Sequence, residues 1–148
     1  MKALIQRVTR ASVTIDGVNV GEIEAGLVVL LGLDRGDNLG NGLRLLAKVL
    51  DYRVFADAEG RMNRSVRDVG GGVLLISQFT LSAQTGKGLR PGFSEAMPPQ
   101  HAETLYLELL SQLQTMYPRV SAGVFGANMQ VSLVNDGPVT FLLETVPD

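Results

Sequence analysis

The order of apolar and polar residues along the chain predicts many short strands. Segments rich in β-branched residues and continuous apolar runs of strand length are both typical of strands. Asp16-Gly17 is a hairpin signal between two of them. The predicted strands are ALIQRV, ASVTI, VNVGEI, GLVVLLGL, YRVFAD, GGVLLISQFTL, RVSAGVF, NMQVSLVN and PVTFLLETV.

Two other segments have apolar residues at helical spacing. The first spans residues 39–50, and the second opens at Pro98-Pro99 and ends before Pro118. Because strands lie at both ends of the chain, we expect an α+β fold with a curved, barrel-like, mostly antiparallel sheet and two covering helices. The helical stripes are Leu43, Leu46, Ala47 and Leu50 in the first helix, and Ala102, Leu105, Leu109, Leu113 and Met116 in the second.

Length and composition predict one globular domain spanning residues 1–148. The chain has 45% apolar and 19% charged residues, which is ordinary for a globular protein. Its opening residues, MKALIQRVTR, include no long apolar stretch. We therefore expect neither a signal peptide nor a membrane span, and a cytoplasmic location.

The composition excludes several kinds of chemistry. The chain has no cysteine, so it has no thiolate nucleophile and no cysteine-ligated metal. One histidine, His101, cannot build a multi-histidine metal site, and we expect it on the surface of the second helix. The net charge of −2 argues against a broad, salt-dependent grip on nucleic acid, but it allows a small local contact. We expect no metal and no cofactor.

The stretch SQFTL, residues 77–81, places hydroxyls and an amide at the end of a buried apolar run. Such side chains either line a pocket or fill one face of the strand, and the residues alone leave both interpretations open. The Thr80 hydroxyl is a poor nucleophile without a base to activate it. The sequence offers no base that can be assigned to it.

The stretch NDGPVT, residues 135–140, places Gly137-Pro138 inside β-forming sequence. Proline donates no ladder hydrogen bond, so it does not belong in a central strand. Asn, Asp, Gly and Pro are all turn residues. On the residues alone, this stretch predicts a tight turn between two strands.

Together these stretches resemble the D-aminoacyl-tRNA deacylase family. Its motifs Ser-Gln-Phe-Thr and Asn-x-Gly-Pro-Val/Phe-Thr match residues 77–80 and 135–140. QRVTRASVTIDG, MNRSV, KGLRPGF and FGANMQVSLVNDGPVTF are also similar, so the resemblance runs nearly end to end. Gly86 and Gly92 stand where the family usually has lysine and serine. The RNA contacts of loop 82–93 therefore do not follow from the resemblance.

The resemblance implies an RNA-binding proofreading enzyme. Its substrate would be the ester between a D-amino acid, or glycine, and the terminal adenosine of tRNA. It also implies a homodimer in which the Gly137-Pro138 bond is cis and reaches into the partner's pocket. Gly137 has no Cβ, so backbone carbonyls there can crowd the substrate α-carbon and exclude an L side chain.

The resemblance further implies catalysis by backbone groups. Amides around Phe79 and Thr80 would stabilise the oxyanion, while the ribose 2′-hydroxyl of the tRNA would handle the proton. Met129 would form a pocket wall, and Arg7 either holds the Gly-Pro carbonyls or is a plain surface arginine. The expected catalytic residues are Ser77, Gln78, Phe79 and Thr80, of which Gln78 would position the substrate.

Two other hypotheses remain open at this point. The protein could be a hydrolase in which Thr80 is the nucleophile and forms an acyl-enzyme. Alternatively, it could be a non-catalytic dimer that binds RNA or another ligand. A covalent adduct on Thr80 would favour the first hypothesis, and binding without turnover would favour the second.

Overall fold

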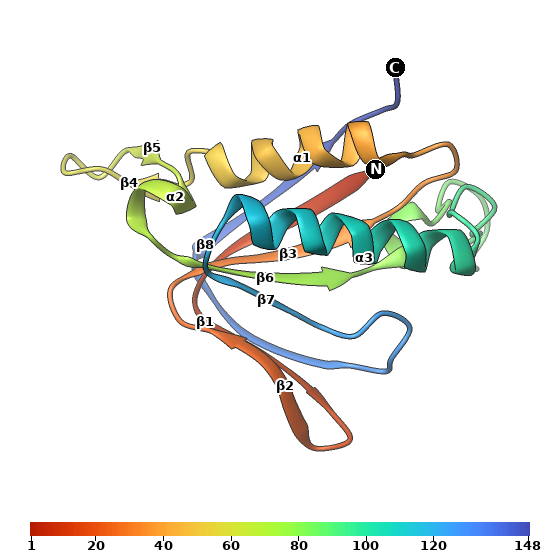
Figure 1. Ribbon diagram of the computed structural model, residues 1–148, viewed down its shortest axis with the longest axis horizontal. Coiled ribbons are helices and arrows are strands. Elements are labelled where there is room, and N and C mark those ends of the chain that lie inside the picture. Colours follow the sequence, from red (N-terminus) through yellow and green to blue (C-terminus); the bar gives the residue numbers. More distant parts are fainter.

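A strongly curved sheet forms the centre of the molecule (Figure 1). This computed structural model describes residues 1–148. The strand order is β2-β1-β3-β6-β7, and β8 pairs with β1 along nearly the whole length of β1. The bounds are β1 Lys2–Ile15, β2 Val18–Ile23, β3 Gly26–Gly32, β6 Gly72–Ser77, β7 Val120–Ala122 and β8 Gln130–Glu144.

The sheet is mixed. Strand β1 runs antiparallel to β2, β3 and β8, whereas β3 pairs with β6, and β6 with β7, in parallel. Parallel neighbours need crossover connections, and the two helices predicted from the sequence supply them. Helix α1, Leu39–Asp51, lies between β3 and β6, and helix α3, Pro99–Met116, lies between β6 and β7.

The two ends of the strand order nearly meet, which gives the sheet its barrel-like form. The Ser121 hydroxyl in β7 donates a hydrogen bond to the Glu22 carbonyl oxygen in β2 at 3.1 Å. A Cβ atom at Gly21 would lie 2.8 Å from the Ala122 carbonyl oxygen. Glycine at position 21 therefore allows β2 and β7 to approach this closely.

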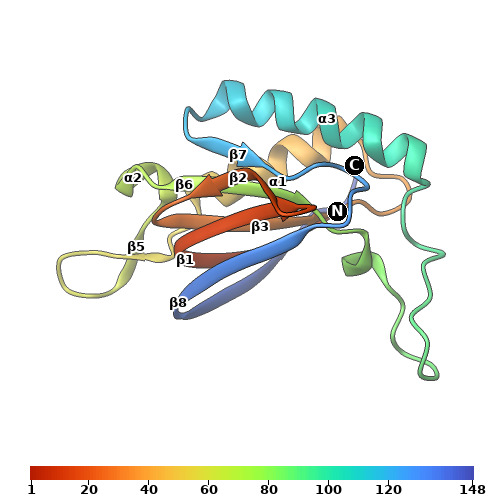
Figure 2. The ribbon, with the colours of Figure 1, turned by 90° about the horizontal axis from the view of Figure 1, so that it is seen from below.

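Apolar side chains pack on both faces of the sheet. Helices α1 and α3 lie on one face (Figures 1 and 2), where 22 buried residues form the larger core cluster. A second cluster of 7 buried residues, including Val28 and Leu74, fills the inside of the curved sheet. Burial on both faces explains why β3 and β6 are continuous apolar runs rather than alternating ones.

The predicted α+β fold with a barrel-like sheet is confirmed, and both predicted helices are present. The structure also has a third, short helix, α2, which spans Val66–Val69. It has four residues, too few to show a helical period, and a capping box formed by Ser65 and Asp68 starts it. No helix of the protein is both long enough and apolar enough to cross a membrane.

Several strand predictions were wrong in detail. ALIQRV and ASVTI were expected as two strands, but they form one strand, β1. YRVFAD contributes only the two-residue strand β4, Phe55–Ala56, which pairs with β5, Met62–Arg64, in a separate hairpin. The segment GGVLLISQFTL stops being a strand at Ser77 and continues as a 3₁₀ helix, η1, Phe79–Ser82. The last two predicted strands are one strand, β8, which continues through Gly137-Pro138.

Candidate functional site

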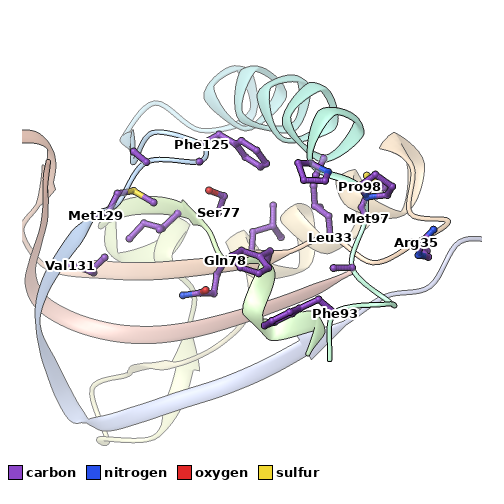
Figure 3. A pocket seen from close by; sticks show the side chains of 18 residues that line it. Leu33, Arg35, Ser77, Gln78, Phe93, Met97, Pro98, Phe125, Met129 and Val131 are labelled. Atoms are coloured by element: carbon purple, nitrogen blue, oxygen red, sulfur yellow. The ribbon is translucent and has the colours of Figure 1, made fainter. Parts of the chain in front are cut away.

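A pocket of about 690 Å³ opens beside the carboxyl ends of β3 and β6 (Figure 3). These two strands are parallel neighbours, so their carboxyl ends lie at the same edge of the sheet. The start of α3 and the connection from β7 to β8 form the other walls. Most of the lining is apolar, including Leu31, Leu33, Ile76, Phe79, Phe93, Met97, Phe125 and Met129.

The first three residues of the motif at 77–80 form one wall of this pocket. Strand β6 ends at Ser77. The backbone N–H of Gln78 donates a hydrogen bond to the Leu31 carbonyl oxygen at 2.7 Å, which holds the turn against β3. Ser77, Gln78 and Phe79 line the pocket, but Thr80 does not. The Thr80 side chain is exposed, and its hydroxyl donates a hydrogen bond to Oε1 of Gln78.

The backbone N–H groups of Phe79 and Thr80 have no hydrogen-bond acceptor within the protein. They belong to the first turn of η1, where backbone donors lack intrahelical partners. Two free donors beside a pocket can bind an oxygen atom that gains negative charge during a reaction.

Aromatic rings form parts of the pocket wall and its rim. The rings of Phe79 and Phe93 are tilted, with centroids 5.1 Å apart, and Phe79 is 60% exposed. Phe125 packs against the buried ring of Tyr106, with centroids 5.6 Å apart. Met129 lines the wall formed by the β7–β8 connection (Figure 3).

The pocket contains no acid–base side chain. Its lining includes no aspartate, glutamate or histidine, and Arg35 is its only charged residue. His101 lies on α3 and is exposed outside the pocket. No group of three or more histidine, aspartate or glutamate side chains in the structure could hold a metal ion. The pocket can therefore bind an apolar or planar group and donate backbone hydrogen bonds, but it offers no general base.

The Gly137-Pro138 segment lies outside this pocket. In the pairing of β1 with β8, Gln6 faces Thr140 and Val8 faces Asn135. Residues 136–139 therefore bulge out opposite Arg7. A bulge on an edge strand tolerates proline, because no ladder bond is lost there. The Gly137-Pro138 peptide bond is cis, and both residues are exposed.

Side chains on both sides hold the bulge in shape. Arg7 donates from Nε to the Asp136 carbonyl oxygen at 3.1 Å and from Nη1 to the Val54 carbonyl oxygen at 2.7 Å. Asn135 accepts a hydrogen bond from the Val139 amide at 3.0 Å and donates one to the Thr140 hydroxyl at 3.0 Å. The first and last residues of NDGPVT thus fix the backbone between them. In the sequence, the polar residues on either side of Gly137-Pro138 were the signal that they hold this backbone in shape.

A family model described as D-Tyr-tRNA(Tyr) deacylase matches residues 4–144 of this chain. The chain belongs to this family. The D-aminoacyl-tRNA deacylase of Stutzerimonas stutzeri (strain A1501) is 57% identical over 145 residues, which cover 98% of this chain and 100% of the relative. The D-aminoacyl-tRNA deacylase of Acinetobacter baylyi is 56% identical over 144 residues, which cover 97% and 99%.

Two solved structures have the same fold as this chain. The structure of a protein named c-Myc DNA Unwinding Element Binding Protein is similar with a TM-score of 0.93 and 44% identity, over 99% of this chain and 100% of that one. A probable eukaryotic D-amino acid tRNA deacylase has a TM-score of 0.80 at 15% identity, over 96% and 97%. The second likeness concerns the fold alone.

Proposed function

We propose that this protein hydrolyses the ester bond of D-aminoacyl-tRNA and releases free tRNA and the D-amino acid. The observation that carries the proposal is the pocket wall formed by Ser77, Gln78 and Phe79, next to two unbonded backbone amides. These three residues belong to the Ser-Gln-Phe-Thr motif, and the chain is 57% identical to a D-aminoacyl-tRNA deacylase. Since aminoacyl-tRNA is used in the cytoplasm, we place the activity there.

The pocket is suited to the terminal adenosine of the substrate. A volume of about 690 Å³ falls in the range of small-molecule sites. Its apolar lining and the exposed ring of Phe79 offer stacking surfaces for a base. The ester on the terminal ribose would then lie beside the turn from β6 into η1.

The reaction proposed here uses few side chains because an aminoacyl ester is already reactive. The pocket orients the ester, and the amides of Phe79 and Thr80 donate hydrogen bonds to the developing oxyanion. The ribose 2′-hydroxyl of the tRNA assists proton transfer, since the pocket lining has no general base. Gln78 positions the substrate end of the ester, and its own orientation is supported by Thr80.

We propose that selectivity for D-amino acids comes from a homodimer. The Gly137-Pro138 bulge is exposed, is held by Arg7 and lies outside the pocket of its own subunit. In an isologous pair, each bulge would enter the pocket of the other subunit, so the dimer would have two equal sites. Backbone atoms next to the substrate α-carbon would exclude an L side chain, whereas a D side chain points away and glycine has none.

The test is ester loss from matched D-, L- and glycyl-tRNA. We expect hydrolysis of the D-aminoacyl and glycyl esters and no acceleration for the L-aminoacyl ester. Binding of D-aminoacyl-tRNA without ester loss would refute the proposed activity. Equal rates for D and L esters would refute the selectivity. Sedimentation of the active protein checks the dimer, and full activity in a monomer would exclude a partner's contribution.

A further inference from the structure

Arg35 is the one charged side chain on an otherwise apolar and neutral pocket. It lies in the loop between β3 and α1, at the end of the pocket far from Met129 (Figure 3). An exposed cation at the mouth of an apolar pocket is a feature of sites for ligands with an apolar body and an anionic end. The site chemistry described above does not use it.

The guanidinium of Arg35 is oriented but not neutralised. Its Nε donates to the Ser94 carbonyl oxygen, and its backbone amide donates to the Glu95 carbonyl oxygen at 2.8 Å. The two carboxylates in its own loop have other cationic partners. Asp37 lies 2.8 Å from the Met1 ammonium, and Asp34 lies 3.1 Å from Nζ of Lys2. Arg35 forms no salt bridge, so its Nη groups are available to an anion.

A second cavity begins on the other side of Arg35. This groove has a volume of about 620 Å³, and its lining includes His101, Thr104 and Glu108 of α3 together with Asp37 and Asn38. It shares Arg35, Met97 and Pro98 with the pocket. Arg35 therefore stands at the boundary between the apolar pocket and a more open groove.

This arrangement matches the order of groups at the 3′ end of an RNA chain. Ser77 and the turn into η1, where the ester would react, line one part of the pocket. Arg35 lines the pocket at a separate place, in the loop between β3 and α1 (Figure 3). A nucleoside that carries an ester on its ribose has a phosphate on its 5′ side, and the next nucleotide follows that phosphate. Guanidinium groups bind phosphate oxygens with charge-assisted hydrogen bonds.

We propose that Arg35 binds the phosphodiester that joins the terminal adenosine of the substrate to the preceding nucleotide, and that the groove beyond Arg35 receives that nucleotide. The inference rests on the proposed function, since it deepens how the same site binds its substrate. Arg35 is then a binding residue that sets the affinity for the RNA and takes no part in ester cleavage.

The experiment compares two substrates, D-aminoacyl-tRNA and the matching D-aminoacyl-adenosine, which has no phosphate. We expect Arg35→Gln to raise KM for the tRNA substrate by roughly tenfold, the effect of losing one charge-assisted contact. kcat for the tRNA and the rate constant for D-aminoacyl-adenosine should stay within about twofold of wild type. Arg35→Lys keeps the charge, so its KM for the tRNA substrate should lie between those of wild type and Arg35→Gln.

A salt titration gives a second readout on tRNA alone. The slope of log KM against log salt concentration should fall by about 0.7 in Arg35→Gln, the value for one phosphate contact on a single strand. Arg44→Gln serves as the matched control, because Arg44 is an exposed arginine on α1 that lines neither cavity. It should change neither KM nor the slope.

Three results would overturn the inference. If Arg35→Gln lowers activity equally on both substrates, the role of Arg35 is to hold the 93–97 loop through its hydrogen bond to Ser94. An unchanged KM and salt slope for tRNA would show that Arg35 does not meet the phosphate. A wild-type protein that cleaves neither substrate would remove the proposed function as well, which distinguishes that failure from the first two.

Discussion

Arg7 in β1 donates a hydrogen bond from Nε to the backbone oxygen of Asp136 in β8, at 3.1 Å. The same guanidinium donates from Nη1 to the Val54 carbonyl oxygen at 2.7 Å. One side chain thus ties the Gly137-Pro138 bulge to the segment that precedes β4. The contact of Arg7 with the Asp136 carboxylate, at 3.6 Å, is longer, and that carboxylate is half-exposed, so the two backbone contacts carry the restraint.

We expect Arg7→Ala to loosen this bulge. Two carbonyl oxygens would lose charged donors, which costs roughly 1.5–3 kcal/mol per hydrogen bond before water replaces them. Thermal unfolding should show the loss of stability, and kcat/KM for D-aminoacyl-tRNA should fall with it. Arg10→Ala is the matched control, because Arg10 is exposed on the same strand and forms no salt bridge. Equal behaviour of the two variants would mean that Arg7 is a plain surface arginine.

The Thr80 hydroxyl donates to the side-chain oxygen of Gln78, and an amide oxygen is not a base. Thr80 also lies outside the pocket lining. We therefore expect Thr80→Val, which keeps the shape of the side chain, to retain activity within about tenfold, or ~1.4 kcal/mol of barrier.

The competing hypothesis gives the opposite result. If Thr80 is the nucleophile, Thr80→Val should lose about a thousandfold or more, the size typical of losing a key catalytic group. The wild-type enzyme should also form a covalent acyl adduct on Thr80. Single-turnover rates with D-aminoacyl-tRNA and mass spectrometry of the quenched enzyme separate the two cases.

The sequence predicted the helices well and the site only in pieces. Pro98-Pro99 and the apolar stripe of α3 are local signals, so the helix was found nearly to the residue. The break of β6 at Ser77 was missed, because residues 78–81, QFTL, alternate polar and apolar residues as a strand does. The 3₁₀ turn depends on the bond from the Gln78 amide to Leu31, a residue of another strand.

Long-range contacts also explain the other misses. The Gly-Pro segment was expected to separate two strands, but Arg7 and Asn135 hold it as a bulge inside one strand. Arg35 was not selected as a site residue, because it is more than forty positions away from Ser77 along the chain. Its one local signal was a polar loop directly after the buried run of β3, at the edge where pockets of such sheets form.

Tyr106 should make the protein sensitive to alkaline pH. Burial raises the pKa of Tyr106 to about 12, from 10.0 for an ordinary tyrosine. Its hydroxyl donates to the Leu75 carbonyl oxygen at 3.3 Å inside the core. Between these two values the unfolded chain releases the phenol proton and the folded protein keeps it, so stability is complete below pH 10 and falls as the pH rises.

The slope from this group is at most about 1.4 kcal/mol per pH unit. Tyr106→Phe removes the titration, so the free energy of unfolding should depend less on pH in this window. The variant should be less stable than wild type at neutral pH, since the Leu75 carbonyl loses its donor. Burial also raises the pKa of Tyr117, so part of the dependence should remain. Denaturant unfolding at pH 8, 10 and 11 measures the difference, and parallel curves for the two proteins would contradict the assignment.

Gly137 should not tolerate a side chain. Its φ of 135° is a conformation that L residues rarely adopt, and a Cβ there would lie 2.6 Å from Cγ2 of Val139 and 3.1 Å from the Val139 amide nitrogen. We expect Gly137→Ala to destabilise the protein by about 1–3 kcal/mol and to lower D-aminoacyl-tRNA turnover, because the bulge must shift. Gly60→Ala is the matched control: Gly60 also has a positive φ, of 79°, but no atom lies within 4 Å of its added Cβ. It should cost stability while leaving turnover of the folded protein unchanged. If folded Gly137→Ala cleaves D-aminoacyl-tRNA as fast as wild type and still spares the L ester, the shape of this bulge does not set the selectivity, and the pocket must reject L side chains by its own walls.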